Sequence, residues 1–167
     1  MQAQRLKVKY SDQITILIGL ETDFITPADL DGLERLLQRH STVVEYIVGS
    51  VHHVNEVPID FDIPTFDRAL QEFPTDTAFD SLISAYLDNQ YTLMRRFHPE
   101  IIGHFDLCRL YHPNHQLRDK PDVWNKVERN VQFAIHYGAL FELNAAAFRK
   151  GWDGPYPGPD VIEVCHY

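Results

Sequence analysis

Two adjacent histidines stand where neither a buried strand nor an ordinary surface loop would need them. His52 and His53 follow an apolar run in the stretch IVGSVHHVNEVPIDFD, residues 47–62, and two aspartates spaced two positions apart come after them. Imidazole is a common metal ligand, so this stretch indicates a metal site. If extended backbone persists through the pair, the two side chains point in opposite directions, and one of them is the expected ligand.

Glu21 and His104 complete a candidate ligand set with His52. A glutamate and two histidines are typical of metal sites that catalyse hydrolysis. Taken singly, each has an ordinary explanation, since Glu21 could form a solvated acid pair with Asp23 and His104 could be a core histidine. Together they predict that Glu21, His52 and His104 meet around a metal ion. Asp106, two residues after His104, is predicted to orient a ligating imidazole.

Two arginines and an asparagine are candidates for binding a phosphate. Arg109 and Arg149 each follow the end of a predicted strand, where a guanidinium can reach a phosphate with two donors. The alternative for either arginine is a plain surface charge. Asn144 adds an amide donor at the end of a strand. The remaining histidines are expected to be structural or exposed: His40, His98, His112, His115, His136 and His166.

Short apolar runs alternate with helical patterns along the chain. The predicted strands are residues 14–20, 43–51, 100–105 and 139–144, and the predicted helices are residues 26–40, 65–72, 77–97 and 121–138. Thr26 with Pro27 marks the start of the first helix, and Gly138 marks the end of the last. This alternation predicts an α/β fold with parallel strands. The candidate ligands and Asn144 then gather at the carboxyl ends of the strands, where such folds carry their chemistry.

The composition and net charge limit the kinds of molecule that the chain is expected to bind. The chain has 167 residues, enough for one domain with a core, and a net charge of −9, which argues against a general nucleic-acid binder. Acidity does not exclude a small phosphorylated substrate, which needs only one or two local cations. Two cysteines, no membrane-length apolar stretch and no signal peptide predict a soluble cytoplasmic chain. No sequence feature indicates an oligomeric state.

Three stretches together resemble the fungal-type histidinol-phosphate phosphatases of the polymerase-and-histidinol-phosphatase (PHP) superfamily: GSVHHVNEVPIDFD, IIGHFDLCRLY and FELNAAAFRKGWDGPYP. The resemblance covers residues 5–160. It implies a distorted, TIM-barrel-like (β/α)7 barrel with a trinuclear metal centre. In that centre a metal-activated hydroxide attacks the phosphate monoester of L-histidinol phosphate, a reaction of histidine biosynthesis.

Matched motif by motif, the resemblance implies the same three metal ligands. The family's strand-end glutamate falls on Glu21, the histidine after G-S-V on His52, and the histidine of G-H-F-D on His104. Both arginines and Asn144 fall on positions that look like substrate or phosphate contacts. His53 falls where a side chain faces the substrate. Zn, Mn and Fe all suit such a set of imidazole and carboxylate ligands.

The chain also departs from the family pattern at both ends. Family members open with an H-x-H motif and a further ligating histidine, and they close with an S-D-D-x-H-type motif; here PYPGPD is followed by VIEVCHY. A full α/β barrel runs to about 250 residues. The departures imply a single, incomplete PHP-like domain over residues 1–167 with an unclosed barrel. One metal site of three would be retained.

Three functions compete on this evidence. The first is a metal-dependent phosphatase of histidinol phosphate, for which the missing ligands predict slow turnover by this chain. The second is a catalytically inactive metal-binding or interaction protein on the same scaffold. The third is a PHP phosphoesterase for another small phosphate ester.

Overall fold

A four-stranded parallel sheet organises the molecule. The computed structural model describes residues 2–165. The strands are β1 (Gly19–Thr22), β2 (Tyr46–Gly49), β5 (Ile101–Ile102) and β6 (Leu140–Phe141), in the order β1-β2-β5-β6, and every pairing is parallel. The predicted α/β fold is confirmed. Strands β1 and β6 each have one neighbour, so the sheet is open, as expected for a partial barrel.

The strands are shorter than the apolar runs that predicted them. The first begins at Gly19 instead of residue 14, because its pairing with β2 starts at Gly19 opposite Tyr46. Residues 14–18 have no strand assignment, and Ile14 and Leu17 are exposed. An apolar run without a neighbouring strand has no backbone partner to make it a strand. Glu21 therefore lies inside β1 and does not follow it.

The four predicted helices are present. They are α2 (Pro27–Arg39), α3 (Ile63–Leu70), α4 (Ala78–Phe97) and α5 (Pro121–Tyr137). Thr26 caps α2, its backbone N–H donating to Asp29 Oδ2 over 2.9 Å, and Gly138 ends α5 at φ 85°. Helix α3 starts two residues earlier than predicted because the Asp62 side chain accepts the N–H of Thr65 at 2.8 Å.

A hairpin and several short helices were not predicted. Strands β3 (His53–Val54) and β4 (Val57–Pro58) pair antiparallel around Asn55 and Glu56, which both have positive φ (49° and 66°). The usual sequence signal of a two-residue turn of this kind is Asn-Gly, which is absent here. The other elements are α1 (Gln2–Lys9), η1 (Leu107–Arg109), η2 (Leu117–Asp119), α6 (Ala146–Arg149) and α7 (Pro159–Val164).

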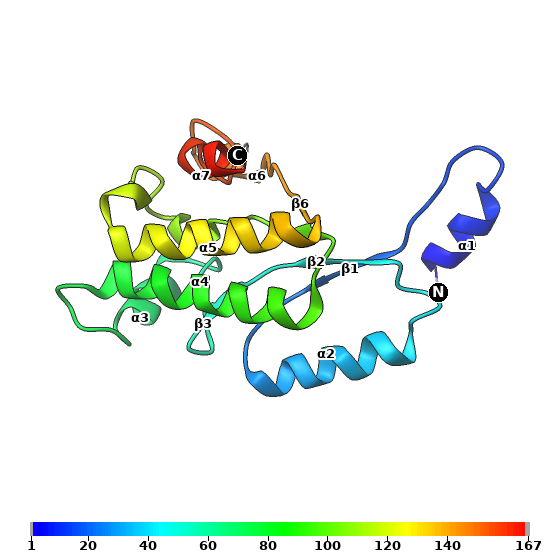
Figure 1. Ribbon diagram of the computed structural model, residues 1–167, viewed down its shortest axis with the longest axis horizontal. Coiled ribbons are helices and arrows are strands. Elements are labelled where there is room, and N and C mark those ends of the chain that lie inside the picture. Colours follow the sequence, from blue (N-terminus) through cyan, green and yellow to red (C-terminus); the bar gives the residue numbers. More distant parts are fainter. Residues whose placement is uncertain (1, 166–167) are drawn as a thin grey trace.

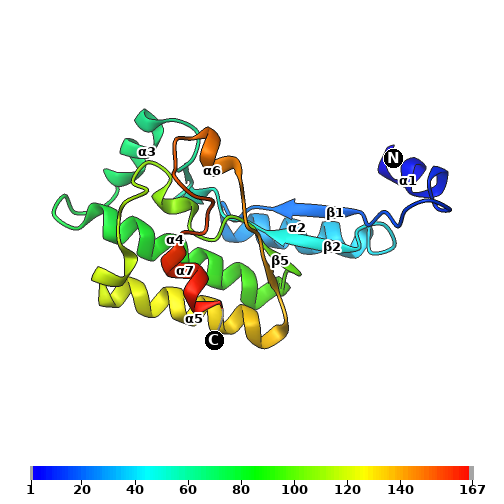
Figure 2. The ribbon, with the colours of Figure 1, turned by 90° about the horizontal axis from the view of Figure 1, so that it is seen from above.

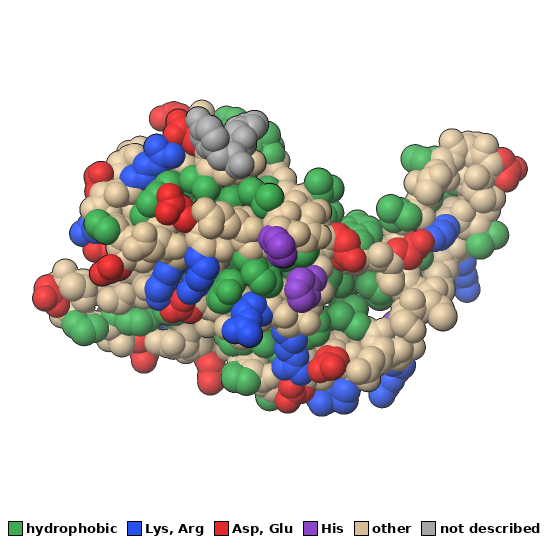
Figure 3. Space-filling view, viewed as in Figure 1, with side chains coloured by type: hydrophobic (Ala, Val, Ile, Leu, Met, Phe, Trp, Pro, Cys, Tyr) green, Lys and Arg blue, Asp and Glu red, His purple; other side chains and the backbone are tan. Residues whose placement is uncertain are grey.

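The core lies in one half of the molecule. Helices α4 and α5 run side by side (Figures 1 and 2), and their facing side chains, Leu87 and Val131 among them, are fully buried. Helix α1, by contrast, has no buried residue over Gln2–Lys9 and projects from the body on an arm (Figure 3). The sheet lies between α1 and the packed helices, and the arrow of β1 points away from α1 (Figure 2). The carboxyl ends of the strands therefore face the half of the molecule that holds the core.

Candidate metal centre

The three predicted ligands converge at the carboxyl ends of neighbouring strands. Glu21 is in β1, His52 follows β2 and His104 follows β5, three strands that are adjacent in the sheet. His52 Nε2 and His104 Nε2 are 3.1 Å apart. Glu21 Oε1 lies 3.2 Å from His104 Nε2 and 3.7 Å from His52 Nε2. Among the described residues this is the one group of three or more ligand side chains close enough to share an ion.

The donor atoms fit a divalent cation. Ligand atoms about 3–4 Å apart are what a four-coordinate ion with bonds of about 2.0–2.2 Å requires. Two imidazole Nε2 atoms in contact must share a single proton, so a cation between them can replace that proton. The Glu21 side chain is 54% exposed, whereas that of His104 is 10% exposed. The group is therefore anchored in the protein on one side and open to solvent on the other.

The two imidazoles differ in their electrostatic environment. Burial, together with the neighbouring His52, lowers the pKa of His104. Burial also disfavours a charged His52, but the carboxylates of Asp23, Asp60 and Glu21 outweigh it and raise the pKa of His52. The protonated imidazole is therefore favoured more at His52 than at His104, and the neutral form that a metal ligand requires is favoured at His104.

Gly103 permits the close approach of the strands beneath the site. A Cβ at Gly103 would lie 2.5 Å from Ser50 Oγ and 3.0 Å from a methyl carbon of Val48. The Ser50 hydroxyl donates to Glu21 Oε1 at 2.9 Å. The absence of a side chain at Gly103 therefore lets Ser50 hold the carboxylate of Glu21 in place.

Asp23, considered as half of a solvated acid pair, is in fact a hydrogen-bond partner of both histidines. Its Oδ1 accepts the backbone N–H of His52 at 2.9 Å, and its Oδ2 lies 2.7 Å from His53 Nδ1. Burial alone would raise the pKa of Asp23, but the hydrogen bonds and charges of these histidines lower it. The sequence signal was the E-x-D spacing, since residues two apart on a strand share a face.

Asp106 does not orient an imidazole, so that prediction is wrong. Its Oδ2 accepts three hydrogen bonds, two from Arg109 (2.6 and 2.8 Å) and one from the Gly158 N–H (2.8 Å). His104 Nδ1 is buried without a hydrogen-bond partner among the described residues. A fully buried guanidinium three residues along the chain attracts the carboxylate more strongly than a neutral imidazole can.

Arg109 does not face the metal centre either, and the prediction that it binds phosphate is wrong. Its five N–H donors are used by Asp106, by Asp160 (2.6 and 3.0 Å) and by the His115 carbonyl (3.0 Å). The residue is only 2% exposed. Burial opposes its charge, but Asp106 and Asp160 raise the pKa of Arg109. A guanidinium has five donors in all, so none is left for a phosphate.

Asn144 pairs with a residue that packs near His104, and Arg149 lies on the helix that follows, α6. Arg149 is exposed on α6 and forms no hydrogen bond or ion pair with the described part of the chain. Burial raises the pKa of Tyr156 and the charge of Arg149 opposes this rise; the Tyr156 ring centroid is 6.4 Å from that of His104. Asn144 pairs with Tyr156 through the backbone, and its Oδ1 accepts the Ala146 N–H at 2.8 Å. The amide nitrogen of Asn144 forms no hydrogen bond with the described part of the chain.

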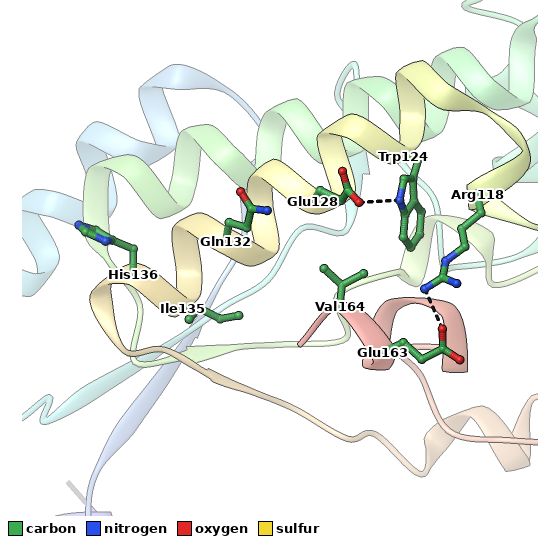
Figure 4. A pocket seen from close by; sticks show the side chains of 8 residues that line it. All are labelled: Arg118, Trp124, Glu128, Gln132, Ile135, His136, Glu163 and Val164. Atoms are coloured by element: carbon green, nitrogen blue, oxygen red, sulfur yellow. Dashed lines mark hydrogen bonds and ion pairs between the residues drawn. The ribbon is translucent and has the colours of Figure 1, made fainter. Parts of the chain in front are cut away.

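A cavity lies elsewhere in the described part of the chain. It has a volume of about 900 Å³ and lies between α5 and α7 (Figure 4). Its lining is Arg118, Trp124, Glu128, Gln132, Ile135, His136, Glu163 and Val164. The Trp124 indole donates to Glu128 and Arg118 forms an ion pair with Glu163, so these four lining side chains already have partners in the protein. None of the predicted site residues lines it. Over residues 2–165, no helix combines the length and the hydropathy that crossing a membrane requires.

Comparison with known proteins gives the family. The PHP domain matches residues 1–146. The chain belongs to the PHP domain family. Its open parallel sheet fits a partial (β/α) barrel, and Glu21, His52 and His104 form a possible metal-binding triad at the strand ends.

Two curated fungal proteins are similar to the chain. One is the probable histidinol-phosphatase of Schizosaccharomyces pombe, 42% identical over 166 residues, which are 98% of this chain and 53% of that protein. The other is the histidinol-phosphatase of Saccharomyces cerevisiae, 32% identical over 188 residues, 97% of this chain and 56% of that protein. The chain thus spans about half the length of the curated relatives it matches.

Proposed function

We propose that this chain carries part of the active site of a metal-dependent phosphatase that hydrolyses L-histidinol phosphate to L-histidinol and phosphate in histidine biosynthesis. The observation that carries the proposal is the convergence of Glu21 Oε1 with the Nε2 atoms of His52 and His104. The similarity to two histidinol-phosphatases supports the choice of substrate. A cytoplasmic location and a small phosphate ester as partner, with no nucleic acid, belong to the same proposal.

Different side chains are proposed to bind the metal ion and the phosphate. Glu21, His52 and His104 would hold one Zn, Mn or Fe ion, which when bound polarises a phosphoryl oxygen and acidifies a coordinated water. Glu21 brings the negative charge, and the lowered pKa of His104 favours the neutral imidazole that binds a metal. We expect Arg149 to neutralise the phosphate. In support, its guanidinium is exposed and has no partner among the described residues, so its donors are available to a ligand.

His53 and Asn144 complete the proposed substrate surface. The His53 Nδ1 is engaged with Asp23, so its Nε2 is the atom available to a substrate. The Asn144 amide nitrogen can donate to a phosphate oxygen while Oδ1 holds the turn into α6.

A second candidate is metal binding without efficient turnover. Residues 2–165 bring together a single ligand group of three side chains. Hydrolysis of a phosphate monoester is among the slowest uncatalysed reactions, and enzymes accelerate it by up to about 10²¹-fold. Such acceleration needs a nucleophile, a polarised phosphoryl group and a stabilised leaving oxygen together. One ion held by three ligands only partly activates the nucleophile and only partly polarises the phosphoryl group.

One experiment separates these candidates. The purified chain is titrated with Zn²⁺, Mn²⁺ and Fe²⁺ and then assayed for phosphate release from histidinol phosphate, serine phosphate and glycerol phosphate, beside His104→Ala. We expect one ion per chain, lost in the variant, and release that favours histidinol phosphate. Metal binding with no release from any ester would support the second candidate, and equal release from all three would indicate a broader phosphoesterase. Unchanged binding by His104→Ala would overturn the site itself.

A further inference from the structure

We propose that Asp23 and Glu142 are positioning residues that fix the two ligand histidines by their backbone amides. The inference deepens the proposed metal centre and depends on it. Neither carboxylate belongs to the ligand group, yet each accepts the main-chain N–H of one member of it. The two carboxylates directly follow the two outer strands of the sheet, β1 and β6, and hold residues that follow the two inner strands.

Asp23 fixes the chain where it leaves β2. The His52 N–H donates to Asp23 Oδ1 at 2.9 Å, and His53 Nδ1 contacts Asp23 Oδ2 at 2.7 Å. One carboxylate therefore holds the backbone of the first histidine and the ring of the second. With the His53 ring held by Asp23, His52 Nε2 is the imidazole nitrogen directed toward His104. This resolves which of the two adjacent histidines joins the ligand group.

Glu142 holds a backbone conformation that His104 does not favour. The φ of His104 is 23°, a region that residues with a Cβ rarely adopt. Its N–H donates to Glu142 Oε2 at 2.9 Å, and its carbonyl accepts the Tyr86 hydroxyl at 3.3 Å. Strained backbone persists where surrounding contacts over-determine it, and such places cluster at functional sites. The two hydrogen bonds hold the peptide of His104 so that Nε2 points at Glu21.

Carboxylates suit this task because hydrogen bonds to a charged acceptor are short and stronger than neutral ones. Mutation of a group that orients a metal ligand typically lowers the metal affinity 10–100-fold. We therefore expect Asp23 and Glu142 to act on affinity through His52 and His104 without contacting the ion.

The same sheet provides a matched control. Glu100 Oε2 accepts the Ile47 N–H at 2.9 Å, the same type of bond between neighbouring strands, at the amino ends of β2 and β5. Removing it should weaken the fold about as much as removing Glu142. It should leave the metal centre untouched, because Ile47 precedes the site by the length of the strand.

The test measures Zn²⁺ affinity by competition with a chromophoric chelator, together with the Co²⁺ absorption spectrum and urea denaturation. Asp23→Ala and Glu142→Ala should bind Zn²⁺ about 10–100-fold more weakly, and Glu100→Ala should bind as the parent does. Glu142→Gln, which keeps an acceptor oxygen, should recover most of the affinity and the parent Co²⁺ spectrum; a Gln variant that loses the ion would make Glu142 a direct ligand and overturn the proposal.

If Glu142→Ala does not fold, Glu142→Asp replaces it, because it keeps the charge but shortens the reach to the His104 N–H. Parent-like affinity in a folded Glu142→Asp or Asp23→Ala would also overturn the positioning role. His104→Ala separates this failure from failure of the metal centre. Loss of binding in His104→Ala beside unchanged binding in both carboxylate variants would leave the metal centre standing and remove only the positioning residues.

Discussion

Two polar clusters in this chain use their ionisable side chains in opposite ways. In the cluster of Arg109, Asp106 and Asp160, all five guanidinium donors have partners and the arginine is buried. In the metal centre, two Nε2 atoms face each other and the Glu21 carboxylate is half exposed. The first cluster has no donor left for a ligand, whereas the second has lone pairs that only a proton or a cation can satisfy. Satisfied polar groups hold a fold together, and unsatisfied convergent ones offer a binding site.

The largest expected effect breaks the closed cluster. Arg109→Met should lower the free energy of unfolding by about 3–5 kcal/mol, because Asp106 and Asp160 would be left as uncompensated charges, Asp106 fully buried. Urea denaturation measures the loss. Asp160→Asn is the milder control, since Asp160 is the more exposed partner. A loss below about 1 kcal/mol in Arg109→Met would show that the cluster does not stabilise the fold.

The next effect concerns the open site. Zn²⁺ at 100 times its dissociation constant should raise the free energy of unfolding by about 2.7 kcal/mol, since the ion binds the folded chain. His104→Ala should abolish this gain, and Asp160→Asn should keep it, because that residue belongs to the other cluster. Thermal denaturation with and without a chelator measures both. Equal stabilisation of His104→Ala and the parent would place the ion outside this centre.

A smaller effect is expected beneath the site. Gly103→Ala places a Cβ 2.5 Å from Ser50 Oγ, and such overpacking costs about 1–3 kcal/mol. Because Ser50 donates to Glu21, Zn²⁺ affinity should fall as well. The double change Gly103→Ala with Ser50→Ala relieves the contact and should restore part of the stability but not the affinity. If Gly103→Ala lost stability alone, Ser50 would have no part in holding the ligand.

The smallest effect on stability is expected at Arg149. Its side chain is exposed, so Arg149→Ala should change the free energy of unfolding by no more than about 0.5 kcal/mol. If the guanidinium contacts phosphate, the substitution should raise KM for the phosphate ester, and Arg149→Lys should restore part of the affinity. Steady-state kinetics measures this, with Lys150→Ala as the neighbouring control. An unchanged KM would return Arg149 to the status of a surface charge.

Much of the site could be derived from the sequence because its residues are tied to strand ends. Apolar runs alternating with helical patterns imply parallel strands, and parallel strands bring their carboxyl ends together. Glu21, His52 and His104 were found by that reasoning, and the structure places their ligand atoms within 4.8 Å of one another. Helix boundaries marked by Thr26 and Gly138 followed from local capping chemistry, which depends on neighbours in the chain.

The partners of each polar side chain were decided by the tertiary structure. Asp106 and Arg109 follow a strand end, as His104 does, and from the sequence alone they were assigned roles in the site. In the structure Arg109 instead binds Asp160, a carboxylate 51 residues further along the chain. From the sequence, Asp23 could be a solvated acid. In the structure the β3–β4 hairpin places His53 against it. Sequence spacing fixes which residues share a strand end, because periodicity is local. Which donor meets which acceptor depends on segments distant in the chain, and only folding brings these together.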